Sequence, residues 1–277
     1  MTRITAAAPC GAVALVAAAA YARVLLDLVH DWLRDPNYSH GFLIPVVSVY
    51  LIWKQRQRLR SMTRSGSNLG LVGILVAVCL LIVGAAAAEV FTQRVSYVVL
   101  LVSIVAYLLG WRWARAVAFP LGFLLFAIPL PYVIYYSVTG PMQGLAARCA
   151  VLGLRVVGVP AMAQGNIIHL RQTSLEVAEA CSGIRSLYAF LALGALLAHS
   201  MRIPVWGRCL VFLLTIPLSV AANAVRVWGS GLGAYLIGPQ AAEGLVHELF
   251  GLVVFAMALG LFVLLSKGAQ RLWRPAA

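Results

Sequence analysis

The chain has 277 residues, of which 62% are hydrophobic and only 10% are charged, whereas a soluble domain carries about a quarter charged residues. The net charge of +13 does not indicate nucleic-acid binding, because the basic residues form short clusters between apolar blocks rather than a face interleaved with stacking aromatic rings. The composition therefore excludes an ordinary soluble protein and predicts an integral membrane protein surrounded by lipid.

Apolar blocks recur along the whole chain, and several are long enough to cross a hydrocarbon core, which takes about 20 residues. They predict an all-α polytopic membrane protein with about eight transmembrane helices. Neither repeats nor low-complexity linkers divide the chain, so we expect a single domain over residues 1–277. The expected spans cover residues 10–29, 39–53, 69–88, 96–110, 116–136, 183–200, 209–228 and 247–266.

The orientation follows from the segments that connect these spans. Each even-numbered span is followed by basic residues, such as Arg202 and Arg208 after the sixth. The positive-inside rule places these segments in the cytoplasm, together with both termini. All eight acidic residues then lie outside or at the outer end of a span.

The longest polar interruption, residues 137–182, falls on the outer side in this topology. Its first half, GPMQGLAARCAVLGLRVVG, is expected to form an interfacial or re-entrant helix with Pro141 near its start. Its second half, GNIIHLRQTSLEV, alternates partly between apolar and polar residues and predicts a short hairpin.

Three residues that can carry chemistry, Cys181, Arg226 and His247, are far apart in sequence but fall at the same membrane depth on the outer face. Their convergence predicts an active site there. The five cysteines show no CxxC spacing, and the five histidines show no HxxxH or HExxH spacing. We therefore expect no metal and no cofactor.

Cys181 is the candidate nucleophile, because a thiolate attacks and the pKa of a thiol falls at a helix N-terminus or beside a cation. Ser182 and Gly183 are typical of a helix start, and Arg185 follows one turn later. The same position also suits a small buried residue at a helix cap.

Arg226 would stabilise an oxyanion or hold a carboxylate, and Asn223, three residues earlier, would orient it from the same helix face. A snorkelling arginine is the alternative. His247 has the intrinsic pKa needed to exchange protons with a thiol and an amine, although a histidine at a helix start is often structural.

Three segments resemble the motifs of the exosortases: EVAEACSGIRSL, IPLSVAANAVRVW and EGLVHELFG. PNYSHGFLIPVVSVYLIW, AIPLPY and GNIIHL also match the pattern of that family, so the resemblance covers nearly the whole chain. It implies a bacterial inner-membrane cysteine protease/transpeptidase that cleaves C-terminal sorting signals, each a Pro-Glu-Pro motif, a span and a basic tail (PEP-CTERM), at the periplasmic face.

The resemblance further implies a thioester and transfer of the protein to an unknown acceptor. It assigns the catalytic roles to Cys181, Arg226 and His247. The residues expected to support the site or bind substrate are Asn223, Ser182, Arg185, Glu179 and His40, with a plain loop role for His40 left open. Two other classes stay open, namely a polytopic transporter and a non-catalytic factor for polysaccharide export.

Overall fold

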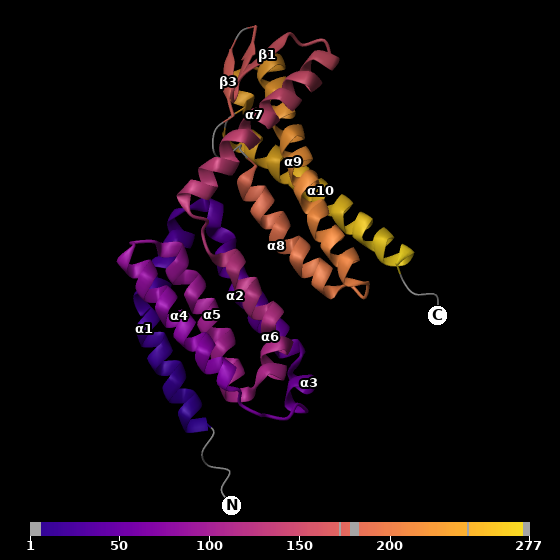
Figure 1. Cartoon of the computed structure of the whole chain (residues 1–277). Helices are drawn as coiled ribbons and strands as arrows, with labels where there is room; N and C mark the ends of the chain where they lie inside the picture. Colours follow the sequence, from indigo (N-terminus) through magenta and orange to yellow (C-terminus); the bar gives the residue numbers. More distant parts are fainter. Residues whose placement is uncertain (1–6, 172, 178–182, 243, 274–277) are drawn as a thin grey trace, which may run out of the picture. The chain divides into compact units, whose positions relative to one another are not determined.

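The computed structural model describes residues 7–171, 173–177, 183–242 and 244–273, with side chains from residue 19 onward. The chain forms two compact units, Met1–Pro131 and Tyr132–Ala277. Both consist mainly of helices (Figure 1). That the two units act as a single domain over residues 1–277 stays a prediction.

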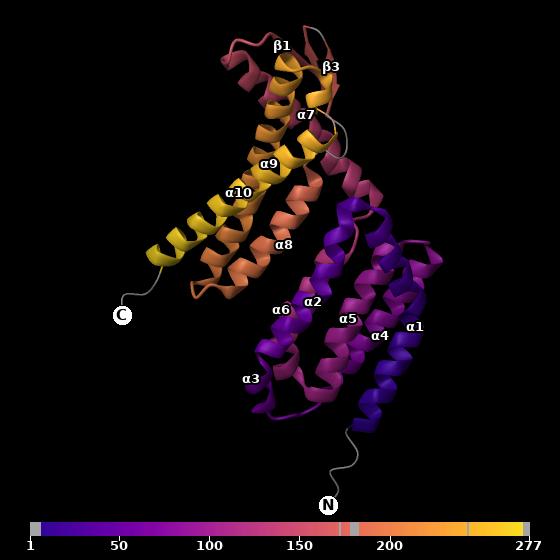
Figure 2. The ribbon, with the colours of Figure 1, turned by 180° about the vertical axis from the view of Figure 1, so that it is seen from behind.

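The first unit is a helical bundle in which α5 packs against α1, α4 and α6, while α2 packs against α6. Both views show α4 and α5 running side by side (Figures 1 and 2). A hydrogen bond of 2.9 Å between the hydroxyls of Tyr21 and Ser96 joins α1 to α5. Its elements are α1 (Ala7–Arg34), η1 (Pro36–Phe42), α2 (Leu43–Lys54), α3 (Arg56–Arg60), α4 (Asn68–Ala86), α5 (Val90–Leu109), α6 (Trp111–Phe123) and η2 (Leu124–Ala127).

The second unit is organised around the long helix α9, which packs against α7, α8 and α10. In Figure 1 the strands lie at one end of this unit, beside α7 and one end of α9. Its elements are α7 (Tyr132–Val156), β1 (Ala161–Gln164), β2 (Ile167–Leu170), β3 (Ser174–Glu176), α8 (Ile184–Ser200), α9 (Val205–Leu236), η4 (Pro239–Ala242) and α10 (Gly244–Leu272).

A small antiparallel sheet follows α7, with strand order β1-β2-β3. The hairpin predicted for residues 165–177 is confirmed, since Ile167 pairs with Glu176 and His169 with Ser174. Ile168 of β2 and Val177, just after β3, lie in one buried cluster with α7 and with Val227 of α9. The sheet is therefore fixed to the helix that carries Arg226.

The prediction of one continuous span over residues 116–136 is wrong. The helix α6 with η2 ends at Ala127, and α7 begins only at Tyr132. Pro129 and Pro131 lie in the break and lack the N–H groups that would continue the helix. Ile128, which precedes Pro129, is extended (φ −93°, ψ 120°), as a residue before proline prefers.

The expected interfacial helix is also corrected at its start. Pro141 does not lie near the beginning of a helix but inside α7, which starts at Tyr132. The apolar residues on both sides of Pro141 thus form one helix, where the sequence analysis divided them between a span and an outer segment. The location of residues 137–182 outside the membrane stays a prediction.

Four helices among the described residues are long and apolar enough to cross a membrane, namely α4, α5, α9 and α10. The segment from α6 to α7 would add a fifth as a broken span, and α8 is a shorter apolar helix. The helix α2, at 12 residues, is about 18 Å long and cannot cross a core of about 30 Å alone. The chain is thus a helical polytopic membrane protein, while the number eight stays a prediction.

Candidate active site

Arg226 and His247 face each other across the contact between α9 and α10. Arg226 Nη2 lies 3.0 Å from His247 Nε2, and both residues are partly buried. A guanidinium only donates hydrogen bonds, so the imidazole accepts this one through the lone pair on Nε2. The structure therefore brings together two of the three residues to which the sequence analysis assigned chemistry.

Ser230 fixes the other side of the same imidazole. Its hydroxyl donates to the carbonyl oxygen of Arg226 at 3.0 Å and lies 2.9 Å from His247 Nδ1. Because the hydroxyl proton is already used, the Nδ1–H of His247 donates to Ser230 Oγ. This arrangement requires a neutral imidazole with its proton on Nδ1, which leaves Nε2 as a base held by Arg226.

Asn223 lies on the same side of α9, three residues before Arg226, and its side chain is only 4% exposed. It contacts the residue that precedes α8. A Cβ on Gly183 would lie 2.6 Å from Asn223 Cγ, and Gly183 has a left-handed φ of 82°. The backbone at the start of α8 is thus packed directly against the Asn223 amide.

Cys181, Glu179 and Ser182 lie outside the described residues. The described residues on either side of them, Val177 and Gly183, both lie close to α9. Val177 shares a buried cluster with Val227, and Gly183 lies against Asn223. Val177 and Gly183 thus both lie near the turns of α9 that carry Arg226.

Arg185 and His40, which were also predicted to support the site, lie in other elements. Arg185 lies in the first turn of α8 with an exposed side chain. His40 lies in η1, which belongs to the first unit, where its ring is 6.5 Å from that of Tyr38. The roles of both in substrate binding stay predictions.

Ser230 and Gly251 were not among the residues predicted from the sequence. A Cβ on Gly251 of α10 would lie 2.6 Å from Arg226 Nε, so this glycine provides the space that the guanidinium occupies. Ser230 follows Arg226 by four residues and Gly251 follows His247 by four. Helical spacing was therefore the signal that could have identified both.

Among the described residues, no group of three His, Cys, Asp or Glu side chains could hold a metal ion. The groups around Arg226 are suited to acid–base and oxyanion chemistry. A planar cation, a neutral imidazole and a hydroxyl form one connected network between α9 and the first turn of α10.

The family model described as transmembrane exosortase matches residues 32–264. The match runs through both compact units and includes Cys181, Arg226 and His247. No curated protein and no solved structure matched the chain.

Proposed function

Because the chain belongs to the transmembrane exosortase family, we propose that it is a membrane-embedded cysteine protease/transpeptidase that processes sorting signals. The proposed catalytic residues are Cys181 as nucleophile, Arg226 as oxyanion donor and His247 as proton carrier. The substrates are proteins with a C-terminal Pro-Glu-Pro motif, an apolar span and a basic tail. The enzyme transfers them from Cys181 to an acceptor nucleophile or to water.

One observation carries this proposal. The described residues on either side of residues 178–182 both lie against α9 near Arg226. Val177 packs in a buried cluster with Val227, and Gly183 lies against Asn223. Only two peptide units join Cys181 to Gly183, a reach of about 7 Å. The short tether to Gly183 therefore favours a thiol near the Arg226–His247 pair.

The first chemical step uses the neutral imidazole. Arg226 turns one N–H from His247 Nε2 toward the scissile carbonyl oxygen, which frees the Nε2 lone pair to accept the thiol proton of Cys181. The thiolate attacks the carbonyl carbon, and the C=O electron pair moves onto the oxygen. Arg226 then stabilises this oxyanion through the N–H that it has turned toward it.

The second step breaks the peptide bond. The carbonyl re-forms, the C–N bond breaks, and the imidazolium gives the proton from Nε2 to the departing amine. Ser230 keeps accepting from Nδ1–H throughout, so the ring holds its orientation while it gains and loses the proton at Nε2. The product is a thioester on Cys181, which an amine, a hydroxyl or water then cleaves.

Charge supports the proposed substrate class and orientation. An acidic motif delivered just outside the membrane would meet the cationic Arg226 where α9 contacts the first turn of α10. The basic tail of the substrate would stay in the cytoplasm by the same rule that places the basic segments of this chain there. The proposed location is the bacterial inner membrane, with both termini in the cytoplasm and the active site toward the periplasm.

The test is co-expression with a reporter that ends in such a sorting signal, followed by size analysis of the reporter. We expect a shortened reporter with the unaltered protein and an intact one with Cys181→Ala. The matched control is Cys209→Ala, because Cys209 is an exposed free cysteine on α9. Hydroxylamine cleaves thioesters, so when it is added the shortened reporter should carry a hydroxamate at its new C-terminus.

Two results would contradict the proposal. Processing that survives in Cys181→Ala would exclude a cysteine nucleophile. Reporters that stay intact with the unaltered protein, across several such signals, would indicate a transporter or a non-catalytic export factor instead.

A further inference from the structure

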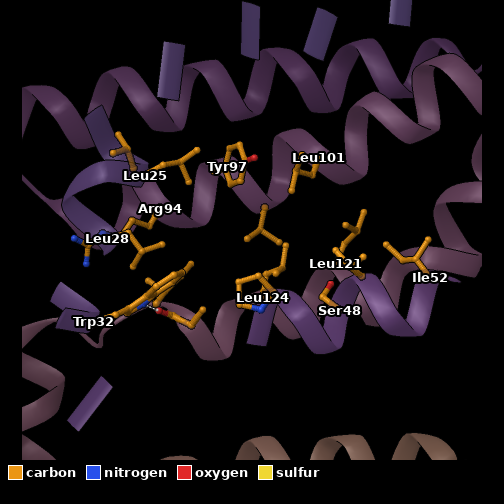
Figure 3. A pocket seen from close by; sticks show the side chains of 16 residues that line it. Leu25, Leu28, Trp32, Ser48, Ile52, Arg94, Tyr97, Leu101, Leu121 and Leu124 are labelled. Atoms are coloured by element: carbon orange, nitrogen blue, oxygen red, sulfur yellow. Dashed lines mark hydrogen bonds between the residues drawn. The ribbon is translucent and has the colours of Figure 1, made fainter. Parts of the chain in front are cut away.

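The first unit contains a cavity of ≈ 330 Å³ between α1, α2, α5 and α6. Its walls are almost entirely apolar, and it is elongated in Figure 3, with Arg94 and Trp32 at one end and Ile52 at the other. This volume is at the lower end of the range of about 300–1,000 Å³ for small-molecule sites. The cavity contains none of the residues of the candidate active site.

Arg94 of α5 supplies the charge in this wall. Its side chain is 5% exposed, and its Nη2 pairs with Asp31 Oδ2 at 2.7 Å. Its Nε is buried and has no hydrogen-bond partner among the residues that the structure describes. A buried guanidinium with an unused donor is costly unless an acceptor reaches it, so this end of the cavity is suited to a hydrogen-bond acceptor such as a phosphate oxygen.

The charged end of the cavity coincides with helix ends. Arg94 lies in the second turn of α5, and Asp31 and Trp32 lie in the last turn of α1. The apolar remainder extends along α2, α5 and α6 toward Ile52 (Figure 3). In the predicted topology the charged end lies at the membrane interface and the apolar part lies deeper, which matches the head group and the acyl chain of a lipid.

Access from the bilayer is consistent with the exposure of α2. Val49 lines the cavity, yet its side chain is 66% exposed, so the cavity reaches the exposed face of α2. The volume is too small for a helix of another protein, which would be about 10 Å wide and about 30 Å long. An acyl chain is narrow enough to enter.

We propose that this cavity binds a phospholipid, with one acyl chain along its apolar walls and the phosphate at Arg94. The phosphate accepts from Nε while Asp31 retains Nη2. The site is separate from the candidate active site, and its occupancy does not depend on the proposed catalytic function.

The test measures lipid binding to the full-length protein in detergent by native mass spectrometry. The probes are phosphatidylglycerol, diacylglycerol with the same chains, and glycerol phosphate without chains. We expect phosphatidylglycerol to bind most tightly, because only it supplies both the phosphate and the acyl chain. Equal binding of phosphatidylglycerol and diacylglycerol would overturn the role of Arg94, and binding of glycerol phosphate alone would indicate a site for free phosphate.

Two variants with opposite expectations test the charged end. Arg94→Gln should weaken phosphatidylglycerol binding roughly tenfold, the effect of one charge-assisted hydrogen bond, and leave diacylglycerol unchanged. Asp31→Asn should strengthen phosphatidylglycerol binding, because it releases Nη2 for the phosphate. Phosphatidylglycerol binding that does not change in Asp31→Asn would contradict the proposal even if Arg94→Gln fails to fold.

A third variant fills the apolar end. Leu101→Trp places a large ring in the cavity and should abolish binding of both lipids. Leu71→Trp on α4 is its control, because Leu71 is 47% exposed and does not line the cavity. Lipid retention by Leu101→Trp equal to that of the unaltered protein would show that lipid binds elsewhere.

Discussion

Gly251 of α10 and Arg226 of α9 lie so close that a Cβ on the glycine would come within 2.6 Å of Arg226 Nε and 2.9 Å of its Cζ. The atoms in conflict belong to a flexible side chain and not to backbone. An added methyl group would therefore displace the guanidinium rather than unfold the helix pair. The contact between Arg226 and His247 depends on this gap in α10.

Gly251→Ala should consequently reduce processing of a sorting-signal reporter by about 100-fold, the effect of losing one oxyanion donor, while the protein still folds. The measurement is the rate of reporter shortening, with thermal unfolding in detergent as the check on folding. Gly260→Ala is the matched control on the same helix, since a Cβ there would meet no atom within 4 Å. Equal loss of activity in the two variants would contradict a specific role for the gap.

Ser230→Ala removes the acceptor for His247 Nδ1–H. The imidazole then loses the bond that fixes its tautomer, and we expect processing to slow roughly tenfold, which corresponds to one hydrogen bond of about 1.4 kcal/mol. The pH profile of processing should change as well, because the proton is no longer confined to Nδ1. Ser200→Ala serves as control, since Ser200 also donates to the carbonyl four residues earlier, on α8. An unchanged pH profile for Ser230→Ala would leave Ser230 a purely structural residue.

Gly183→Ala combines two costs at the start of α8, a left-handed φ of 82° and a Cβ within 2.6 Å of Asn223 Cγ. Gly158→Ala isolates the first cost, because Gly158 has the same φ and open space around it. The φ term alone is about 1–2 kcal/mol. We expect Gly183→Ala to lower Tm clearly more than Gly158→Ala, and Asn223→Ala to restore part of the difference. Equal Tm values for the two glycine variants would mean that α8 does not depend on the contact with Asn223.

Glu89 caps α5 in the first unit and gives the stability of that unit a pH dependence. Burial by itself would raise the pKa of Glu89, but hydrogen bonds from Thr92 and Phe91, together with the nearby Arg94, outweigh it and lower the pKa. The stabilisation is therefore complete above the ordinary pKa of a glutamate and is lost as the pH falls through the lowered value.

Glu89→Gln should accordingly remove part of the decrease in Tm that the unaltered protein shows between about pH 6 and about pH 3. At neutral pH the variant should be less stable by about 0.5–1 kcal/mol, because a neutral amide is a weaker cap. Glu176→Gln, on the exposed strand β3, controls for the loss of one negative charge. A Tm that falls as steeply in Glu89→Gln as in the unaltered protein would exclude this carboxylate as the origin.

The sequence predicted most helices well, because long apolar blocks have few alternatives in a membrane. Each expected span overlaps a helix, and the hairpin after residue 165 was found from its alternation. The span over residues 116–136 was wrong because hydrophobicity was weighed above Pro129 and Pro131. Both prolines were visible in the AIPLPY segment, where they end one helix and allow the next to begin.

The candidate site was only partly within reach of the sequence. Membrane depth placed Arg226 and His247 at one level, and the structure shows them 3.0 Å apart, while their catalytic roles and that of Cys181 stay predictions. Depth along a helix does not reveal which way a side chain points around it. For that reason Ser230 and Gly251 were missed, although each lies one turn from a residue that was identified.

Composition and the order of apolar blocks by themselves determined that this chain is a helical membrane protein, and its motifs placed it among the exosortases. Those properties depend on the chemistry of residues near one another in the chain. Only the tertiary structure decided that the Nε2 lone pair of His247 faces Arg226, that Ser230 holds Nδ1, and that Arg94 closes one end of an apolar cavity. These relationships join residues of different helices, and the rotation and packing of those helices are set by side-chain contacts that no local pattern encodes.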